Sequence, residues 1–424
     1  MTRRRRTLLV LALVAVALLV ALYWLSRPRS VAALVTRQLG AALGLEIHAD
    51  GITEYRLRGT PLLVLRNVRV REPGAPNLLL TARRIHVALP WSTLRTRELV
   101  ARRIELDAPH LDLPALQHWL ATRPPSEKRL PRLTDGLRIR DGEIANDDWR
   151  IDRIDVDLPL LDPAQPLRAR LRGRYLDAPL AIPVDLAVAI VRPDALIRNG
   201  STGFATHGAV TIGHGTDWRL PATVALSGPL QLGGDELRIA PARLGTAATY
   251  ESGTTRVPFA LGLYGPLRFD EATWTWAPAG VALRPRGTDA GDPIPKADAH
   301  GTLALGRRLT LQLDGVLAQW PQAWPALPPP LGQSTSPLPF ALRYDGAAGF
   351  TDTATLRLAR DAYRFEGHFR LPDMLAWIEQ PAGSPLPPLT GSLLAPKIEV
   401  SGATLEGVEV EFDDGAPPAP GTPP

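Results

Sequence analysis

The chain has 424 residues, of which 45% are hydrophobic, with 43 prolines, 36 glycines and no cysteine. The absence of cysteine excludes a disulfide framework, a zinc–thiolate site and a cysteine nucleophile, and the hydrophobic content excludes a disordered chain. The formal charge is +5, but residues 1–110 alone carry a net +11. This basic segment includes a long apolar run and contains no nucleic-acid-binding motif, so we expect a membrane and not a nucleic acid as its partner.

The N-terminus predicts a membrane anchor. Arg3, Arg4, Arg5 and Arg6 precede an apolar run from Leu8 to Leu25, which as a helix would be about 27 Å long, enough to cross a bilayer. Arginine-rich flanks stay in the cytoplasm, so we expect the N-terminus inside and the body outside. A cleaved signal peptide would need a shorter apolar stretch and a small-residue cleavage site. Residues 1–26 are therefore interpreted as a cytoplasmic stub and a single transmembrane anchor.

Helices are expected to be few after the anchor. Ser30 can cap an amphipathic helix that ends at Leu43, and this helix could lie on the membrane surface or plug one end of a sheet. Pro114 and Pro372 can start two further helices, over Ala115–Ala121 and Asp373–Glu379. We divide the chain into a membrane-proximal region over 27–122, a linker over 123–132, a body over 133–412 and a disordered proline-rich tail over 413–424.

Most of the body alternates between apolar and polar residues, which predicts β-strands with one buried face. Asp155 and Asp157 alternate with apolar residues in one such strand, and arginines alternate with apolar residues over Leu167–Tyr175 in the next. The loop Pro159–Pro166 permits a hairpin, so we expect the two aspartates to pair with the arginines from Arg168 to Arg174 across the strands.

Glycine recurs at the centre of five strand-like segments: VALSGPL (224–230), LGLYGPL (261–267), LQLDGVL (311–317), FEGHFRL (365–371) and LTGSLLA (389–395). Glycine inside a strand marks a bulge or a bend. The predicted fold is therefore mainly β: an N-terminal transmembrane helix and a short amphipathic helix, then a long antiparallel sheet curled into a groove, with a few short helices.

No catalytic motif is present. The sequence contains no G-x-S-x-G elbow, phosphate-binding loop or H-E-x-x-H motif, and its eight histidines are scattered. We therefore predict no catalytic residue, cofactor or metal site. Trp274 and Trp276 fall on one face of a strand, where we expect them to be core side chains and not a ligand platform.

The two ends of the chain resemble the AsmA family of the Gram-negative envelope. The similarity lies in the anchor, in GLEIHADGI, in GTPLLVLRNVRVREPGAPNLLLTARRIHVALPWSTL (59–94), in RRIELDAPHLDL (102–113) and in PPLTGSLLAPKIEVSGATLEGVEVEFDD (387–414). The resemblance implies an inner-membrane protein with a periplasmic β-groove, related to bridge-like lipid-transfer proteins and linked to phospholipid movement or outer-membrane homeostasis. It supplies no catalytic residues.

Such a groove needs an apolar inner face, because each methylene exposed to water costs about 0.8 kcal/mol. A filled sandwich core would use the same alternation, and the sequence does not separate the two. Besides lipid handling, a scaffold or accessory factor for outer-membrane protein assembly or secretion, which recruits envelope proteins through sheet edges, and an envelope enzyme are the alternatives. The residues expected to line the groove are Val156, Leu158, Leu171, Leu186, Val188, Leu311 and Leu313.

Overall fold

The computed structural model describes residues 40, 44–50, 54–56, 62–88, 100–122, 130–233, 236–287, 293–322, 324, 327, 336–379, 388–400 and 403–413. The predicted anchor with Arg3–Arg6, the helix expected over 30–43 apart from Gly40, and the tail after Asp413 lie outside these residues. None of the helices in the described residues is long and apolar enough to cross a membrane. Strands dominate the described residues, so the mainly β class is confirmed.

The chain forms two compact units, Met1–Ile197 (unit 1) and Arg198–Pro424 (unit 2). The boundary expected over 123–132 falls inside unit 1, where strand pairing continues across it: β9 (Leu137–Ala145) pairs with strands that precede residue 113. Of the helices expected from the two prolines, α4 (Leu113–Ala121) and α7 (Leu371–Glu379) are present. A further short helix, α5 (Pro193–Ile197), was not predicted.

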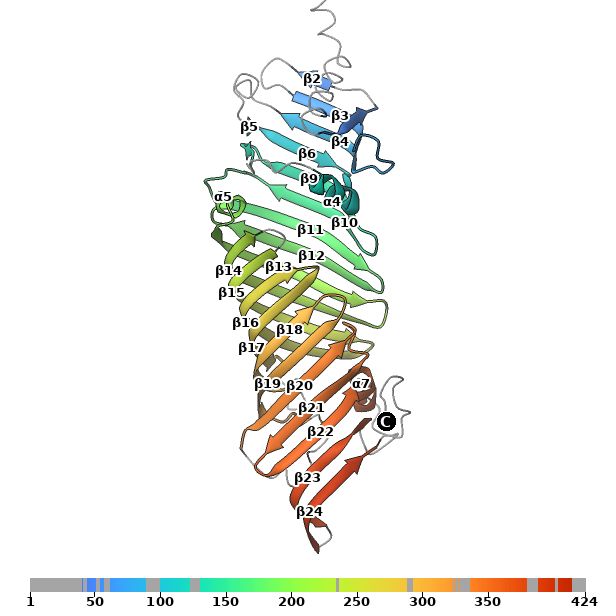
Figure 1. The fold of residues 1–424 in the computed structure, drawn as a ribbon, viewed down its shortest axis with the longest axis vertical. Helices are drawn as coiled ribbons and strands as arrows, with labels where there is room; N and C mark the ends of the chain where they lie inside the picture. Colours follow the sequence, from blue (N-terminus) through green and yellow to red (C-terminus); the bar gives the residue numbers. More distant parts are fainter. Residues whose placement is uncertain are drawn as a thin grey trace, which may run out of the picture. The chain divides into compact units, whose positions relative to one another are not determined.

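Unit 1 contains one sheet of ten strands (Figure 1). β1 and β2 pair with the two halves of β3, and the sheet then runs through β4, through β6 and β7, and on to β9, β10, β11 and β12. A separate two-stranded pair joins β5 and β8. The strands not yet given bounds are β1 (Glu46–Ala49), β2 (Glu54–Arg56), β3 (Leu62–Arg71), β4 (Leu80–Ala88), β5 (Val100–Ala101), β6 (Arg103–Asp107), β7 (His110–Asp112), β8 (Arg132–Leu133), β10 (Arg150–Leu158), β11 (Leu167–Asp177) and β12 (Leu180–Ile190).

The crossover that contains α4 makes β9 parallel to β6 and β7, while the other pairs in this sheet are antiparallel. Parallel neighbours need a connection of about a dozen residues or more, and the segment from α4 to β9 provides it. Asp112 caps α4, since its carboxylate accepts a hydrogen bond of 2.8 Å from the Ala115 amide. The helix packs Leu116 and Trp119 against a core cluster that includes the buried Val68.

Unit 2 is an antiparallel meander of twelve strands in chain order (Figure 1). These are β13 (Ser201–His214), β14 (Trp218–Gly233), β15 (Glu236–Ser252), β16 (Thr255–Asp270), β17 (Thr273–Pro285), β18 (Lys296–Leu305), β19 (Leu309–Gln319), β20 (Leu338–Gly346), β21 (Thr353–Arg360), β22 (Tyr363–Arg370), β23 (Leu389–Val400) and β24 (Ala403–Phe412).

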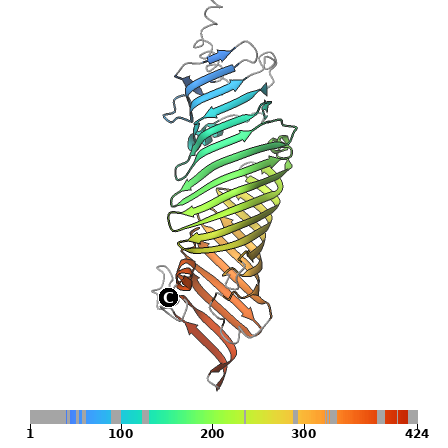
Figure 2. The ribbon, with the colours of Figure 1, turned by 180° about the vertical axis from the view of Figure 1, so that it is seen from behind.

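A line of register shifts, which we call the crease, crosses the long strands of unit 2, drawn from behind in Figure 2. The pairing register shifts at matching places in β14, β15, β16 and β17. Gly228 and Gly265 lie at this crease with φ of +158° and +138°, and a Cβ atom there would lie 2.4 Å and 2.1 Å from backbone oxygens of the next strand. The glycine prediction is thus confirmed for these two. Around Gly315, Gly367 and Gly391 the register is continuous, so these three glycines mark no bulge.

The sheet of unit 2 curls back on itself. A Cβ atom built on Gly349, in the loop between β20 and β21, would lie 3.9 Å from Nε2 of His214 at the end of β13. β13 and β20 are seven strands apart in the meander, so only strong curvature can bring these ends together. The curled sheet that the sequence predicts is confirmed for this unit.

Candidate functional site

Five of the seven predicted groove residues come together on one face of β10, β11 and β12 in unit 1. Val156 lies opposite Leu171, which lies opposite Leu186. Directly opposed residues of neighbouring strands place their side chains on the same face. Leu158 and Val188 lie two positions along on the same face. We call these five residues and the apolar residues beside them on β11 and β12 the β10–β12 apolar face.

This face is largely uncovered. None of the 11 residues of β11 or the 11 residues of β12 is fully buried, although apolar residues occupy one face of both strands. Leu158 is buried, with 6% of its surface exposed, and packs against the small β5–β8 pair through Leu133. Val156, Leu171, Leu186 and Val188 are half-buried. Leu167 and Ala169 at the start of β11 pack against the same cluster as Leu158. An apolar face packed under a second layer would contain fully buried side chains, so the rest of this face is open along β11 and β12.

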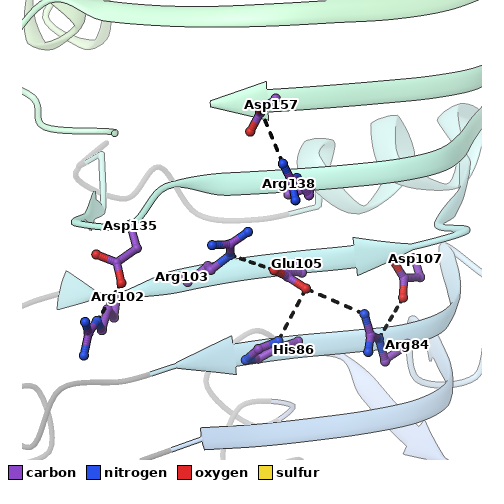
Figure 3. Close-up of polar contacts among 9 residues, drawn as sticks. All are labelled: Arg84, His86, Arg102, Arg103, Glu105, Asp107, Asp135, Arg138 and Asp157. Carbon is purple, nitrogen blue, oxygen red and sulfur yellow. Dashed lines mark hydrogen bonds and ion pairs between the residues drawn. The ribbon is translucent and has the colours of Figure 1, made fainter. Parts of the chain in front are cut away.

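The opposite face of the same sheet carries charged side chains in cross-strand register. His86 of β4 lies opposite Glu105 of β6, Glu105 lies opposite Arg138 of β9, and Arg138 lies opposite Asp157 of β10. Figure 3 shows this row, with the Arg138–Asp157 pair at 3.7 Å. Asp157 in turn lies opposite Arg170 of β11. Basic and acidic residues therefore alternate along the row from Glu105 to Arg170.

Glu105 is the most heavily contacted carboxylate in this row. Its oxygens lie 2.7 Å from Nε of Arg103, 3.5 Å from Nδ1 of His86 and 3.6 Å from a guanidinium nitrogen of Arg84 (Figure 3). Arg84 also binds Asp107 at 2.7 Å. The carboxylates and basic side chains of this cluster are held in mutual ion pairs, the arrangement of a structural network.

The arginines of β11 pair with aspartates, but mostly not with those expected. Arg170 and Arg172 do lie opposite Asp157 and Asp155 in the register, yet both hydrogen-bond to Asp185 of β12, at 2.9 Å and 3.0 Å. The expected cross-strand register is therefore confirmed, while the hydrogen bonds of these two arginines go to Asp185. A single carboxylate between two guanidinium groups gains two charge-assisted hydrogen bonds, which accounts for the preference.

Two aspartates on this face, Asp152 and Asp185, have lowered pKa values. The hydrogen bond from Arg170 is the largest of the effects that hold the pKa of Asp185 below its ordinary value. The hydrogen bonds from Arg174 do the same to the pKa of Asp152, through contacts of 2.9 Å and 2.6 Å to its two oxygens. Both carboxylates are therefore held in their charged form, and the polar face remains ionised and wet.

The other two predicted groove residues lie in unit 2, in a filled part of the sheet. Leu311 and Leu313 of β19 are each 8% exposed. Leu311 forms a core cluster with the buried Tyr344, against which Phe350 and Phe369 pack. Both leucines are buried, as expected for side chains that point inward. The apolar face around them is covered by the protein's own side chains, so no open groove lies here.

Trp274 is not a core residue, and that expectation is wrong. It is 40% exposed and contacts Phe269, with ring centroids 4.6 Å apart. Trp276 is half-buried, and its indole nitrogen donates a hydrogen bond of 3.2 Å to the carbonyl of Gly265. The difference arises because Trp274 stands at the end of its strand, where the sheet no longer covers it.

The described residues contain no group of three or more histidine, aspartate or glutamate side chains arranged to hold a metal ion. No family model, curated protein or solved structure matches this chain.

Proposed function

We propose that the protein binds phospholipid acyl chains along a β-groove to which the β10–β12 apolar face belongs. The observation that carries the proposal is the lack of any fully buried residue in β11 and β12, two strands with one apolar face. Water-exposed apolar surface of this kind costs about 25 cal/mol for each Å². A lipid tail laid on it would remove that surface from water, together with the surface of the tail.

The rest of the proposal comes from the sequence. Arg3–Arg6 and the apolar run after them support a single-pass inner-membrane anchor with a cytoplasmic N-terminus and a periplasmic body. The resemblance of both chain ends to the AsmA family supports a role in outer-membrane and cell-envelope homeostasis. In this proposal the protein is not an enzyme: the groove holds and moves lipid without breaking a bond.

The ionised face behind the groove supports the same function. Ion pairs cover the outer side of β4 to β12, from Glu105 to Asp185. A strand with one apolar and one charged face keeps its orientation, because a slip by one residue would turn the charges toward the lipid. The wet side and the lipid side therefore stay distinct.

Photo-crosslinking in cells tests the proposal. A photoreactive amino acid is placed at Leu186, on the β10–β12 apolar face, in the full-length chain. The matched control is Ala187, the next residue of the same strand, which points to the charged face and lies opposite Arg170. We expect phospholipid adducts by mass spectrometry at Leu186 and none at Ala187. Equal capture at both positions, or none at Leu186, would refute lipid binding by this face.

A scaffold that recruits envelope proteins is the second candidate, and one observation favours it. Among the described residues β24 pairs only with β23, which leaves a free strand edge with Leu405 48% exposed. A free edge can accept a strand from another protein. A photoreactive residue at Leu405 that captures a defined envelope protein, together with no lipid at Leu186, would favour the scaffold.

A further inference from the structure

One row of apolar side chains runs along the rim of unit 2, across six consecutive strands. Each member lies directly opposite the next in the strand register, so all six share one face of the sheet. We call this set the rim row. Its members, from β14 to β19, are Leu232, Leu237, Phe269, Trp274, Leu305 and Leu309.

Three of the six members of the rim row are exposed: Leu232, Trp274 and Leu305, at 36%, 40% and 46%. Leu237, Phe269 and Leu309 are half-buried. Two positions inward on each strand lies a second row, in which Ile239 and Leu267 are 2% and 3% exposed. The apolar side chains of unit 2 therefore extend from the buried row to the rim row on the same face, with no polar row between them.

Some other exposed apolar side chains have polar partners in the register. Leu394, for example, lies between Arg364 and Glu409. Single exposed apolar residues are ordinary on any protein surface. In contrast, Trp274 and Leu305 are direct partners and both are exposed, so the rim row is a contiguous apolar surface of the kind that marks a binding site.

The charges at the rim are arranged asymmetrically. The turn between β18 and β19 carries Arg307, which is exposed and makes no ion pair with any described residue. At the β16–β17 hairpin end stand instead Asp270, the last residue of β16, and Glu271 in the turn. An anionic group would be repelled from the acidic turn and attracted to Arg307, beside Leu305.

We propose that the rim row binds the acyl chain of a phosphate-bearing lipid, with the phosphate at Arg307 and the chain directed toward β14. The row spans five interstrand steps, about 24 Å, which accommodates a chain of about 15 Å, half the thickness of a bilayer core. The inference rests on the proposed lipid-binding function and adds the place where lipid enters or leaves unit 2. The exposed indole of Trp274, an amphipathic ring, lies midway along the row.

Crosslinking to a defined lipid tests the inference. The purified full-length chain carries a photoreactive amino acid at Leu305, and the probe is dioleoylphosphatidylglycerol. The matched control is His300, an exposed residue of the same strand on the opposite face, and Leu186 is tested in parallel. We expect lipid adducts at Leu305 and none at His300.

The outcomes separate the inference from the proposed function. An adduct at Leu186 without one at Leu305 overturns the rim site and leaves the proposed function intact. No adduct at either position overturns both. Capture of a protein and not a lipid at Leu305 in cells also overturns the rim site, since a partner chain would then cover it.

The role of Arg307 has its own test. In the Leu305 crosslinking background, Arg307→Gln should lower capture of dioleoylphosphatidylglycerol about threefold, the loss expected for one exposed charge contact. Capture of dioleoylglycerol, which has the same chains but no phosphate, should not change. Arg286→Gln, an exposed arginine after β17, is the matched control and should have no effect. Equal loss for both lipids, or no loss for either, would overturn the phosphate assignment.

Discussion

The apolar faces of β10–β12 in unit 1 and of β19–β20 in unit 2 follow the same alternation and differ in what covers them. β11 and β12 contain no fully buried residue. In β19, by contrast, Leu311, Leu313 and Leu317 are 8%, 8% and 6% exposed, and Leu338 of β20 is 1% exposed. The first face is available to a ligand and the second is a protein core.

The curl of unit 2 accounts for the difference. Pairing register does not, because β11–β12 and β19–β20 both pair without a register shift. In unit 2 the aligned bulges at Gly228 and Gly265 crease the sheet, and the curl brings the Gly349 loop to His214. Curvature therefore decides whether an alternating strand yields a groove or a core.

The largest difference in stability between the two faces is expected when an aspartate replaces a leucine on each of them. Leu313→Asp would bury a carboxylate near Leu342, at a cost of several kcal/mol, and should prevent unit 2 from folding. Leu171→Asp places the same charge on the open face and should cost about 1 kcal/mol, mainly through strand propensity. Limited proteolysis and the yield of folded protein measure both. An equal loss of folded protein in the two variants would mean that the apolar face of β11 is as well covered as that of β19.

Truncation of leucine should show the same contrast at a smaller scale. Leu338→Ala removes a fully buried side chain and should lower the free energy of unfolding by about 3 kcal/mol. Leu186→Ala removes a half-buried one, and we expect a loss near 1 kcal/mol. Denaturant titration followed by tryptophan fluorescence gives both values. A loss at Leu186 as large as that at Leu338 would contradict an open face.

Much of the local structure could be predicted from the sequence, because it depends on neighbouring residues. Alternation located β11, the loop Pro159–Pro166 gave the β10–β11 hairpin, and the prolines located α4 and α7. The shared face of Val156, Leu171 and Leu186 also follows from alternation alone.

Features set by distant segments could not be predicted in the same way. Asp185 competes for Arg170 and Arg172 only once β12 is placed beside β11. Whether Leu311 lines a groove or fills a core depends on Phe350 and Phe369, which the curl brings to it. The rim row is likewise invisible in the sequence, since its six members come from six strands and meet only through the register.

The smallest expected effect concerns the ion pairs behind each face. Asp152 and Arg174 have side chains 19% and 31% exposed, whereas Asp314 and Arg343, a similar pair on β19 and β20, are 49% and 45% exposed. Since solvent screening weakens exposed pairs, Asp152→Asn should cost about 1 kcal/mol and Asp314→Asn a few tenths. Because the open face adds little packing, the ion pairs carry a larger share of the stability around β10 and β11.

The dependence on pH identifies the charge as the cause. The pKa of Asp152 is lower in the folded protein than its ordinary value, so the folded state holds fewer protons than the unfolded state as the pH falls. The contribution of the pair is therefore complete above the unfolded pKa of about 3.9 and disappears as the pH drops through the lower folded pKa. Denaturant titrations of the wild type and Asp152→Asn should differ at pH 7 and converge in strong acid. A difference that persists there would assign the loss to packing and not to the ion pair.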